Sequence, residues 1–396
     1  MSSAAPDAVS PDPASADSAS AVSAGSLGAG VARRWREIDP LLPAPPLESP
    51  HCGAALVVAG QGAAIAAGRC EHWVGAPGSL DLSWGAARRY QLAAAVADPG
   101  VADGLGQLLS LWREHLNELP GTGDTDTAAV VNWPSRDVDG ITTLLRYGLD
   151  PLEVLAARPA PRRGHEQALA GAPQATILHA GDSLRIRRAG PADIDSVARL
   201  GMGIIRFDSL FAAVNERADS FEALRREAAA LVAGHAPWTW LAERGGEPVG
   251  LLAAQRPEAA GWIAPMTSLA PAAYLMLMFV QPGERGTGVG AALVSQFHRE
   301  ADAAGVAVTL LHHAQLNPLS VPFWSRQGYR PLWTSWQVLP ARAVRLPVRQ
   351  HGTGVALPLR LEEPRLQPEP RHEHQQQAGD DDADHRPALL GGRPHQ

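Results

Sequence analysis

The stretch of sequence that decides the fold runs from residue 274 to residue 295, YLMLMFVQPGERGTGVGAALVS. The apolar run 274–280 predicts a buried strand, and a turn over 281–284 follows it. The segment 288–304 then has the pattern of an amphipathic helix. Glycines between a strand and a helix expose backbone N–H groups where the helix dipole is positive. The stretch therefore predicts an anion site that suits a phosphate or a pyrophosphate.

The spacing of the glycines excludes two common phosphate-binding loops. Gly286, Gly288 and Gly290 fall at every second position, which is not the G-x-G-x-x-G spacing of dinucleotide sites. No lysine follows them, so the loop is not a P-loop. For this segment taken alone, a glycine-rich turn without a ligand is the alternative.

A second segment, 306–329, reads VAVTLLHHAQLNPLSVPFWSRQGY. Its pattern predicts a buried strand over 306–313 and a short helix that begins at Asn317. Gly328 is a C-cap glycine for that helix, and Tyr329 opens another strand.

Together the two segments resemble the GNAT superfamily of acetyl-CoA-dependent N-acetyltransferases. The first matches the motif V-x-P-x-x-R-G-x-G-x-G from Val280 to Gly290. The second matches N-x-x-S/A-x-x-F-Y/W-x-x-x-G-Y/F from Asn317 to Tyr329. The resemblance covers roughly residues 184–340 and implies the element order βααβββαβαβ. It also implies direct transfer of an acetyl group from the thioester to an amine.

The resemblance implies a role for several residues. The backbone N–H at or near Val280 polarises the thioester carbonyl in the manner of an oxyanion site. Asn317 bonds the pantetheine arm, and Ser320, one helical turn later, faces the same way. The cofactor-binding residues expected in full are Val280, Arg285, Gly286, Thr287, Gly288, Val289, Gly290, Ala291, Asn317, Ser320 and Trp324.

The sequence departs from the family pattern at the groups that move protons. Trp324 stands where many members carry a tyrosine general acid, and an indole cannot serve as one at neutral pH. The cofactor strand also carries no glutamate. His312 and His313 are the candidate catalytic bases, and strand alternation sends one of them into the cleft and the other away. A hydrogen-bonded structural role is the alternative for either histidine.

The acceptor wall in the family is the two-helix segment that corresponds here to 204–233. Asp208, Glu216 and Asp219 lie in it and could attract a cationic amine. A solvated helix face is the alternative interpretation of these acids.

An internal repeat is the economical interpretation of the region before the recognised half. Residues 128–151 overlie 308–331 without a gap, and 96–109 overlie 280–293. In the second overlay Asp103 replaces Thr287, and its carboxylate would repel a pyrophosphate. We therefore expect a degenerate first copy that binds cofactor poorly. Chance similarity between alanine-rich segments is the alternative.

The predicted fold class is α/β (α+β), with two tandem GNAT-like units that are each a mixed twisted sheet flanked by helices. The expected parts are a disordered extension (1–48), the degenerate unit (50–158), a linker (159–183), the catalytic unit (184–340) and a possible edge strand followed by a disordered tail (341–396).

Composition narrows the class of protein. A net charge of −7 over 396 residues, with no lysine, gives no reason to expect nucleic acid. No apolar run is long enough to cross a bilayer, and the first 30 residues lack the pattern of a signal peptide, so we expect no membrane partner and a cytoplasmic location. Two cysteines, Cys52 and Cys70, make no disulfide framework. We expect no metal; a zinc site with the neighbouring His51 and His72 is the alternative.

The function predicted from the sequence is acetyl-CoA-dependent N-acetylation of a small-molecule or peptide amine. The alternative is a non-catalytic acyl-CoA-binding or scaffold protein that retains the cofactor loop, and Trp324 is the feature that favours it.

Overall fold

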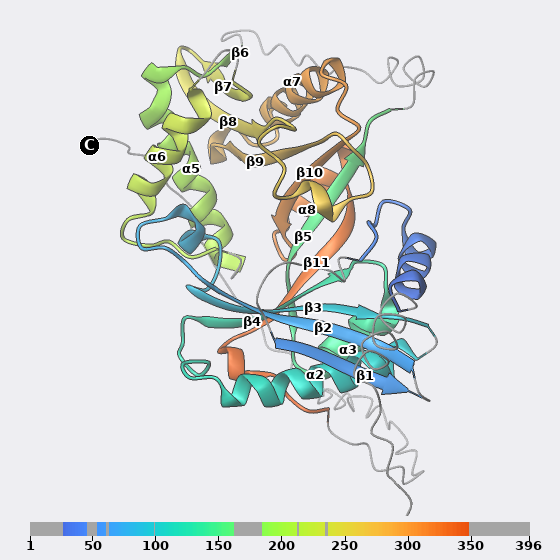
Figure 1. The fold of residues 1–396 in the computed structure, drawn as a ribbon. Coiled ribbons are helices and arrows are strands. Elements are labelled where there is room, and N and C mark those ends of the chain that lie inside the picture. Colours follow the sequence, from blue (N-terminus) through green and yellow to red (C-terminus); the bar gives the residue numbers. More distant parts are fainter. Residues whose placement is uncertain are drawn as a thin grey trace, which may run out of the picture. The chain divides into compact units, whose positions relative to one another are not determined.

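The computed structural model describes residues 27–45, 54–60, 63–98, 100–161, 184–211, 214–233 and 237–347. These residues contain one 11-stranded sheet with the strand order β1-β2-β3-β4-β11-β5-β10-β9-β8-β7-β6 (Figure 1). Parallel pairs occur at β3–β4 and β9–β10, and the other neighbours are antiparallel. The expectation of a mixed sheet flanked by helices is confirmed.

The first half of the fold comprises residues 54–159. Its elements are β1 (Ala54–Gly60), β2 (Ala63–Val74), the 3-10 turn η1 (Leu80–Ser83), β3 (Arg88–Val96), α2 (Val101–Glu118), β4 (Thr127–Pro134), α3 (Val138–Arg146) and β5 (Asp150–Pro159).

The second half comprises residues 185–338. Its elements are β6 (Arg185–Arg188), α5 (Ile194–Asp208), α6 (Ser220–Val232), β7 (Thr239–Arg244), β8 (Glu247–Gln255), the 3-10 turn η4 (Ala264–Met266), β9 (Ala272–Val280), α7 (Val289–Ala303), β10 (Val308–Ala314), α8 (Ser320–Arg326) and β11 (Arg330–Val338). Their order follows the predicted βααβββαβαβ pattern. From β7 onward it also repeats the order of the first half.

The two halves exchange their last strands. β5 of the first half lies between β11 and β10, and β11 of the second half lies between β4 and β5 (Figure 1). The pairing is symmetric, because Glu153 lies opposite Ser335 while Leu155 lies opposite Trp333. Val154 to Ala157 are all buried, as expected for a strand with layers on both faces. The sequence did not predict that the two units share one sheet in this way.

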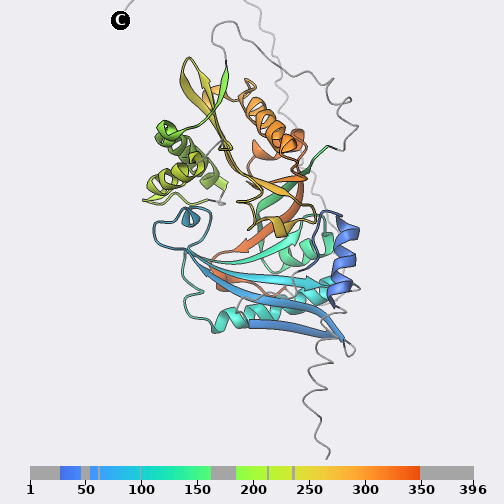
Figure 2. The ribbon, with the colours of Figure 1, turned by 45° about the horizontal axis from the view of Figure 1, so that its top comes forward.

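Helices cover both faces of the sheet, each through an apolar stripe. In α2 the buried residues Val101, Leu105, Leu108, Trp112 and Leu116 recur at helical spacing, and the helix packs on β1, β2 and β3. α7 packs on the other half of the sheet, and α5 and α6 lie on the face opposite α7 (Figure 2).

The expectation of a disordered extension over 1–48 is wrong for residues 27–42. Residues 27–38 form a helix whose Leu27, Val31 and Trp35 are buried. Trp35 makes an edge contact with Trp333, with 5.1 Å between ring centroids. The apolar spacing of 27, 31 and 35 is helical, and the alanine- and serine-rich sequence before it obscured that signal.

Several other expectations fall partly or wholly outside the described residues. Residues 162–183 of the linker and the tail from 348 onward lie outside the described residues. Residues 344–347 form no strand, and the rest of the possible edge strand lies outside the described residues. His51 and Cys52 also lie outside the described residues. Cys70 is described, and it is a buried free thiol whose pKa is raised to about 11 by burial. No helix within the described residues is long and apolar enough to span a membrane.

Candidate active site

A cleft opens in the second half where β9 and β10 separate. The two strands pair from Ala272 opposite Val308 to Leu275 opposite Leu311, and then diverge. A bulge in the β8–β9 ladder at this point leaves Met276 without a partner on β8. The N–H of Gln281 donates to the carbonyl of Val249 on β8. Because successive N–H groups of a strand point to opposite edges, the N–H groups of Val280 and Met278 point toward the open cleft.

The glycine loop after β9 has the conformation of an anion cradle. Gly286 and Gly288 have φ angles of 79° and 92°, which is the left-handed region that favours glycine. No atom lies within 4 Å of where a Cβ would stand at either position. Among the described residues, no acceptor bonds the N–H groups of Gly286 and Gly288. Gly288 is the N-cap of α7, so these groups lie at the positive end of that helix.

Two sets of contacts fix the loop. Glu284 forms an ion pair with Arg244 at 3.0 Å, and the hydroxyl of Thr287 donates to the Glu284 carbonyl at 2.8 Å. At Gly290 a Cβ would stand 3.0 Å from Cε of Met278, so the glycine allows the helix to approach the strand. The loop is therefore held in place before any ligand arrives.

Arg285 lies across the end of β9. Its Nε donates to the carbonyl of Val280 at 3.3 Å. Its guanidinium carbon lies 4.5 Å from the ring centroid of Phe207 and 5.7 Å from that of Phe279. Stacking on aromatic faces orients a positive charge beside the glycine loop.

A cavity of about 520 Å³ lies at the cleft, and we call it the second-half cavity. Residues of β9 and β10, including Tyr274, Met278 and His312, form its floor. Ser320 and Trp324 of α8 and residues of α5 and α6 line it as well. The cavity also receives side chains from the first half: Leu80, Asp81, Trp84, Arg89 and Glu153.

Both candidate histidines line the second-half cavity, although alternation predicted that only one would. The reason is that β10 has lost β9 as a neighbour beyond Leu311, so the cavity reaches both faces of the strand. His312 Nδ1 lies 3.0 Å from the hydroxyl of Tyr274. His313 is 9% exposed, and its Nδ1 lies 3.2 Å from the carbonyl of Ala314. Burial lowers the pKa of His313, which keeps it neutral.

Asn317 acts as the cap of α8 in this structure. Its Oδ1 accepts from the N–H groups of Leu319 and Ser320 at 2.9 and 3.1 Å. Its Nδ2 donates to Asp208 at 2.8 Å. The side chain is 3% exposed, so its role toward pantetheine stays a prediction. Burial raises the pKa of Asp208, and the bond from Asn317 opposes that rise.

Residues 206–329 match the acetyltransferase (GNAT) family. Those residues form a GNAT acetyltransferase domain. The match includes the glycine loop and the second predicted motif, and the chain therefore carries an acyltransferase. No curated protein matched the sequence.

Solved structures resemble this chain only distantly. A GCN5-related N-acetyltransferase from Sphaerobacter thermophilus is 14% identical, with a TM-score of 0.42 over 72% of this chain and 80% of that one. A GNAT-family acetyltransferase from Colwellia psychrerythraea is 11% identical, with a TM-score of 0.40 over 72% and 84%. A tandem GNAT protein from the clavulanic acid biosynthesis pathway is 15% identical, with a TM-score of 0.37 over 80% and 95%. At these values the resemblances add no argument to the family match.

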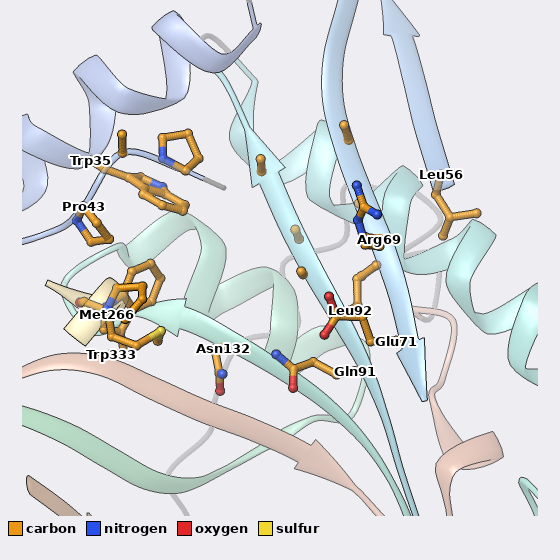
Figure 3. Close-up of a pocket in the computed structure, with 18 of the residues that line it drawn as sticks. Trp35, Pro43, Leu56, Arg69, Glu71, Gln91, Leu92, Asn132, Met266 and Trp333 are labelled. Atoms are coloured by element: carbon orange, nitrogen blue, oxygen red, sulfur yellow. The ribbon is translucent and has the colours of Figure 1, made fainter. Parts of the chain in front are cut away.

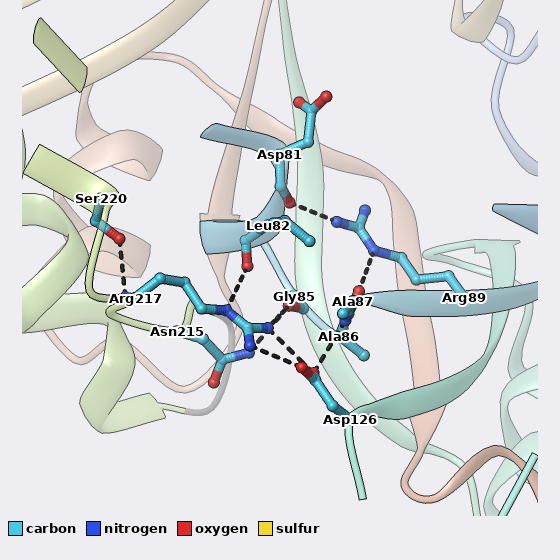
Figure 4. A network of polar contacts seen from close by, with 10 residues as sticks. All are labelled: Asp81, Leu82, Gly85, Ala86, Ala87, Arg89, Asp126, Asn215, Arg217 and Ser220. Atoms are coloured by element: carbon cyan, nitrogen blue, oxygen red, sulfur yellow. Dashed lines mark hydrogen bonds and ion pairs between the residues drawn. The ribbon is translucent and has the colours of Figure 1, made fainter. Parts of the chain in front are cut away.

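A polar network connects the first half to the segment of the GNAT domain around Arg217 and Ser220 (Figure 4). The guanidinium of Arg217 forms two hydrogen bonds with Asp126, at 2.7 and 3.0 Å. It also donates to the carbonyls of Leu82 and Gly85. Ser83 and Ser220 share a buried hydroxyl contact at 2.8 Å. The segment around η1 is thereby held as a wall of the second-half cavity.

The first half contains an equivalent cavity of about 450 Å³, which we call the first-half cavity (Figure 3). Asn132 on β4 stands where His312 stands on β10, 180 positions later. Met266 from η4 of the GNAT domain lines it, just as η1 of the first half lines the second-half cavity. Trp333 on the exchanged strand β11 occupies the place that Glu153 on β5 occupies in the second-half cavity.

The first half lacks the glycine loop altogether. Four residues separate β3 from α2, whereas eight residues separate β9 from α7. The N-cap of α2 is Gly100, with a φ of 97°, so Gly100 and not Gly104 is the counterpart of Gly288. The predicted overlay of 96–109 on 280–293 therefore aligns the ends of β3 and β9 correctly. It misaligns the helices α2 and α7 by four residues. Asp103 lies in the first turn of α2, and the missing loop is what removes the anion cradle.

Proposed function

We propose that this chain is an acetyl-CoA-dependent N-acetyltransferase that transfers the acetyl group directly to an amine of a small molecule or a peptide. The observation that carries the proposal is the pair of left-handed glycines, Gly286 and Gly288, with unbonded N–H groups at the start of α7. They lie directly beyond a strand that separates from its neighbour and opens a cavity.

The residues of the loop fit a CoA diphosphate. Open space at the Cβ positions of Gly286 and Gly288 lets a ligand approach the backbone closely. The N–H groups from Gly286 to Ala291 would bind the diphosphate, and Arg285 would add a positive charge. Acetyl-CoA supplies the acetyl thioester. The N–H groups of Val280 and Met278, which point toward the cleft, would stabilise negative charge on the thioester oxygen.

We infer that residues 184–340 are the catalytic unit and that the first half shapes the substrate site. The first half contributes Asp81, Trp84 and Arg89 to the second-half cavity, and the network around Arg217 fixes their segment. Its own cavity has no glycine loop at its mouth. One acetyl-CoA per chain is the expected stoichiometry.

The test is release of free CoA thiol from acetyl-CoA when the purified full chain is offered a panel of primary amines. Thiol release that depends on both enzyme and amine supports the transferase. Binding of acetyl-CoA by calorimetry, with no thiol release for any amine, would instead support the non-catalytic acyl-CoA-binding alternative. Absence of binding would contradict both.

A further inference from the structure

We propose that Glu153, on the strand that the first half exchanges into the GNAT domain, binds the ammonium group of the acceptor and takes its proton. The acceptor is then a cationic primary amine, and one active site is built from both halves. This inference rests on the proposed function and names the substrate class and the base for it.

The position of Glu153 follows from the strand exchange. On β5 it lies opposite Ala314 of β10, two residues from His312, at the level where β10 has already left β9. Glu153 lines the second-half cavity together with Tyr274 and His312. The cofactor strand β9 has no carboxylate of its own, so the exchanged strand supplies one from the opposite side of the cleft.

The carboxylate of Glu153 has no directly bonded partner within the described residues, although the positive charge of the Arg89 guanidinium acts on it. Among the described residues, no hydrogen bond or ion pair to its side chain occurs, although the residue is only partly exposed. A carboxylate that is partly withdrawn from water without a partner is costly, and a ligand cation would offset that cost. Glu243 on β7, by contrast, is paired with Arg187 at 2.7 Å.

The charge around Glu153 favours a cation. The titratable groups that face the cavity from the surrounding elements are Asp81, Arg89, Glu153, Asp208, Glu227, Tyr274, His312 and His313. Four of these are carboxylates and one is a guanidinium. Arg89 is turned toward backbone carbonyls, because it donates to those of Asp81 and Ala86 (Figure 4).

The pKa values of two neighbouring carboxyl groups also reflect the negative charge in the cavity. Burial raises the pKa of Asp208, and the negative charge of Glu153 raises it further. Burial also raises the pKa of Glu227, with a smaller contribution from Asp81. Carboxylates that repel one another in a partly dry cavity gain most when a cation enters it.

The histidines, unlike a carboxylate, carry no negative charge with which to bind an ammonium group. The Nδ1 of His313 is engaged with the Ala314 carbonyl, and the residue is almost fully buried. The Nδ1 of His312 is engaged with Tyr274. In the first-half cavity the counterpart of Glu153 is Trp333, whose indole N–H donates to the carbonyl of Met266 at 2.8 Å. The carboxylate is thus found in the cavity that has a glycine loop and replaced in the cavity that lacks one.

The reaction balances with acetyl-CoA as the only other reactant. The ammonium gives one proton to the Glu153 carboxylate and becomes a neutral amine. The nitrogen lone pair then forms the N–C bond to the acetyl carbon while the C–S bond breaks, and its electron pair stays on sulfur. The nitrogen loses a second proton, which the thiolate takes up to give free CoA thiol. Glu153 returns its proton to water.

The test compares Glu153→Gln with wild type in the full chain, using two acceptors. One is a primary alkylamine, which is an ammonium at pH 7, and the other is an arylamine, which is neutral there. We expect E153Q to lower kcat/KM by about 100-fold for the alkylamine and by less than about threefold for the arylamine, because general-base catalysis contributes on that order and a neutral amine needs no first deprotonation. The matched control is Glu71→Gln, a change of the same chemistry in the first-half cavity, with no effect on either acceptor.

Two further measurements separate this inference from the proposed function and from misfolding. Acetyl-CoA affinity of E153Q, measured by calorimetry, is expected to equal that of wild type. The alkylamine rate of E153Q is expected to rise with pH until the free amine predominates. Equal losses for the two acceptors, or an unchanged alkylamine rate, would overturn the role of Glu153 while wild-type activity leaves the transferase standing. If wild type itself releases no thiol with any amine, the proposed function fails first.

Discussion

Glu153 and Trp333 occupy equivalent places on the two exchanged strands, 180 positions apart. Glu153 lies opposite Ala314 at the mouth of the second-half cavity, and Trp333 lies opposite Pro134 in the first-half cavity. The same backbone position thus carries a carboxylate in one cavity and an indole in the other. This pair and the four-residue difference between the two loops are the differences on which we base the proposal that the second half is the catalytic one.

The half-buried acid Asp208 is expected to cost stability. Its pKa is raised by burial above the ordinary value of 3.8, so the folded state holds the proton more tightly than the unfolded state. Stability therefore falls as pH rises through the interval between the two pKa values. Asp208→Asn, which can still accept from Asn317, is expected to have a higher Tm than wild type at pH 7, with the difference vanishing in acid. Thermal unfolding at both pH values checks this. A lower Tm at pH 7 would be contrary evidence, and the exposed Glu216→Gln is the control.

The ion pair at the start of α5 is expected to behave in the opposite way. Arg187 bonds Asp193 through two nitrogens at 2.7 Å, and this contact lowers the pKa of Asp193. The stabilisation is present above the ordinary pKa of 3.8 and lost as pH falls through the folded value. Asp193→Asn is expected to lower the free energy of unfolding by about 1.5–3 kcal/mol at pH 7, as for other hydrogen bonds to charged groups. Urea unfolding at pH 7 and in acid measures the difference.

The control for that experiment is Asp195→Asn, since Asp195 makes an exposed pair with Arg225. We expect it to leave the urea midpoint unchanged. A loss for Asp193→Asn that persists undiminished in acid would show that the stabilisation does not come from the charge.

The network around Arg217 is expected to control acceptor binding without affecting the cofactor. Arg217→Gln removes the bonds that hold the η1 segment against α6, and Asp81 and Trp84 lie on that segment. The acceptor KM is expected to rise by about tenfold to 100-fold, because small displacements of positioning groups have effects of this size. The KM for acetyl-CoA is expected to stay unchanged. Steady-state kinetics with the best amine test this, and a rise in both constants, or in neither, would be inconsistent with it.

The control for Arg217→Gln is Arg206→Gln. Arg206 forms only a surface pair with Glu216, and both side chains are well exposed. We expect this variant to match wild type in both constants.

The local elements of the GNAT domain could be predicted from the sequence. The strand before the glycine loop and helix α7 lie within two residues of the expected bounds, because their apolar periodicity is strong. Gly328 has the positive φ, 86°, that a C-cap glycine requires. These features depend on residues close to one another in the chain.

The strand exchange could not be predicted in the same way, because pairing in a sheet is set by contacts far apart in sequence. The apolar residues of β5 suit an inner position between any two strands, and nothing local specifies β10 and β11 as its neighbours. The place of Glu153 was missed for that reason. Its one signal was an isolated acid within the stretch 151–157, which is otherwise apolar.

The exchange predicts that neither half folds alone. Without residues 1–165, β10 and β11 each lose β5, and their buried edges keep unsatisfied N–H and C=O groups. Residues 1–165 and 166–396 expressed separately are expected to be insoluble or unfolded by circular dichroism, and co-expressed they are expected to purify as a one-to-one complex. A folded, active fragment 166–396 would refute this dependence.

The central claim is that the glycine loop of the GNAT domain, and not its counterpart in the first half, binds acetyl-CoA. Gly288 and Gly100 are both N-cap glycines with positive φ and open space at Cβ, so the same substitution can be made at each. Calorimetric titration of acetyl-CoA into Gly288→Asp and Gly100→Asp is the most direct test. We expect a loss of affinity of about 30-fold or more, roughly 2 kcal/mol, for Gly288→Asp and wild-type affinity for Gly100→Asp. Equal affinities for the two variants, or a loss at Gly100 alone, would contradict it.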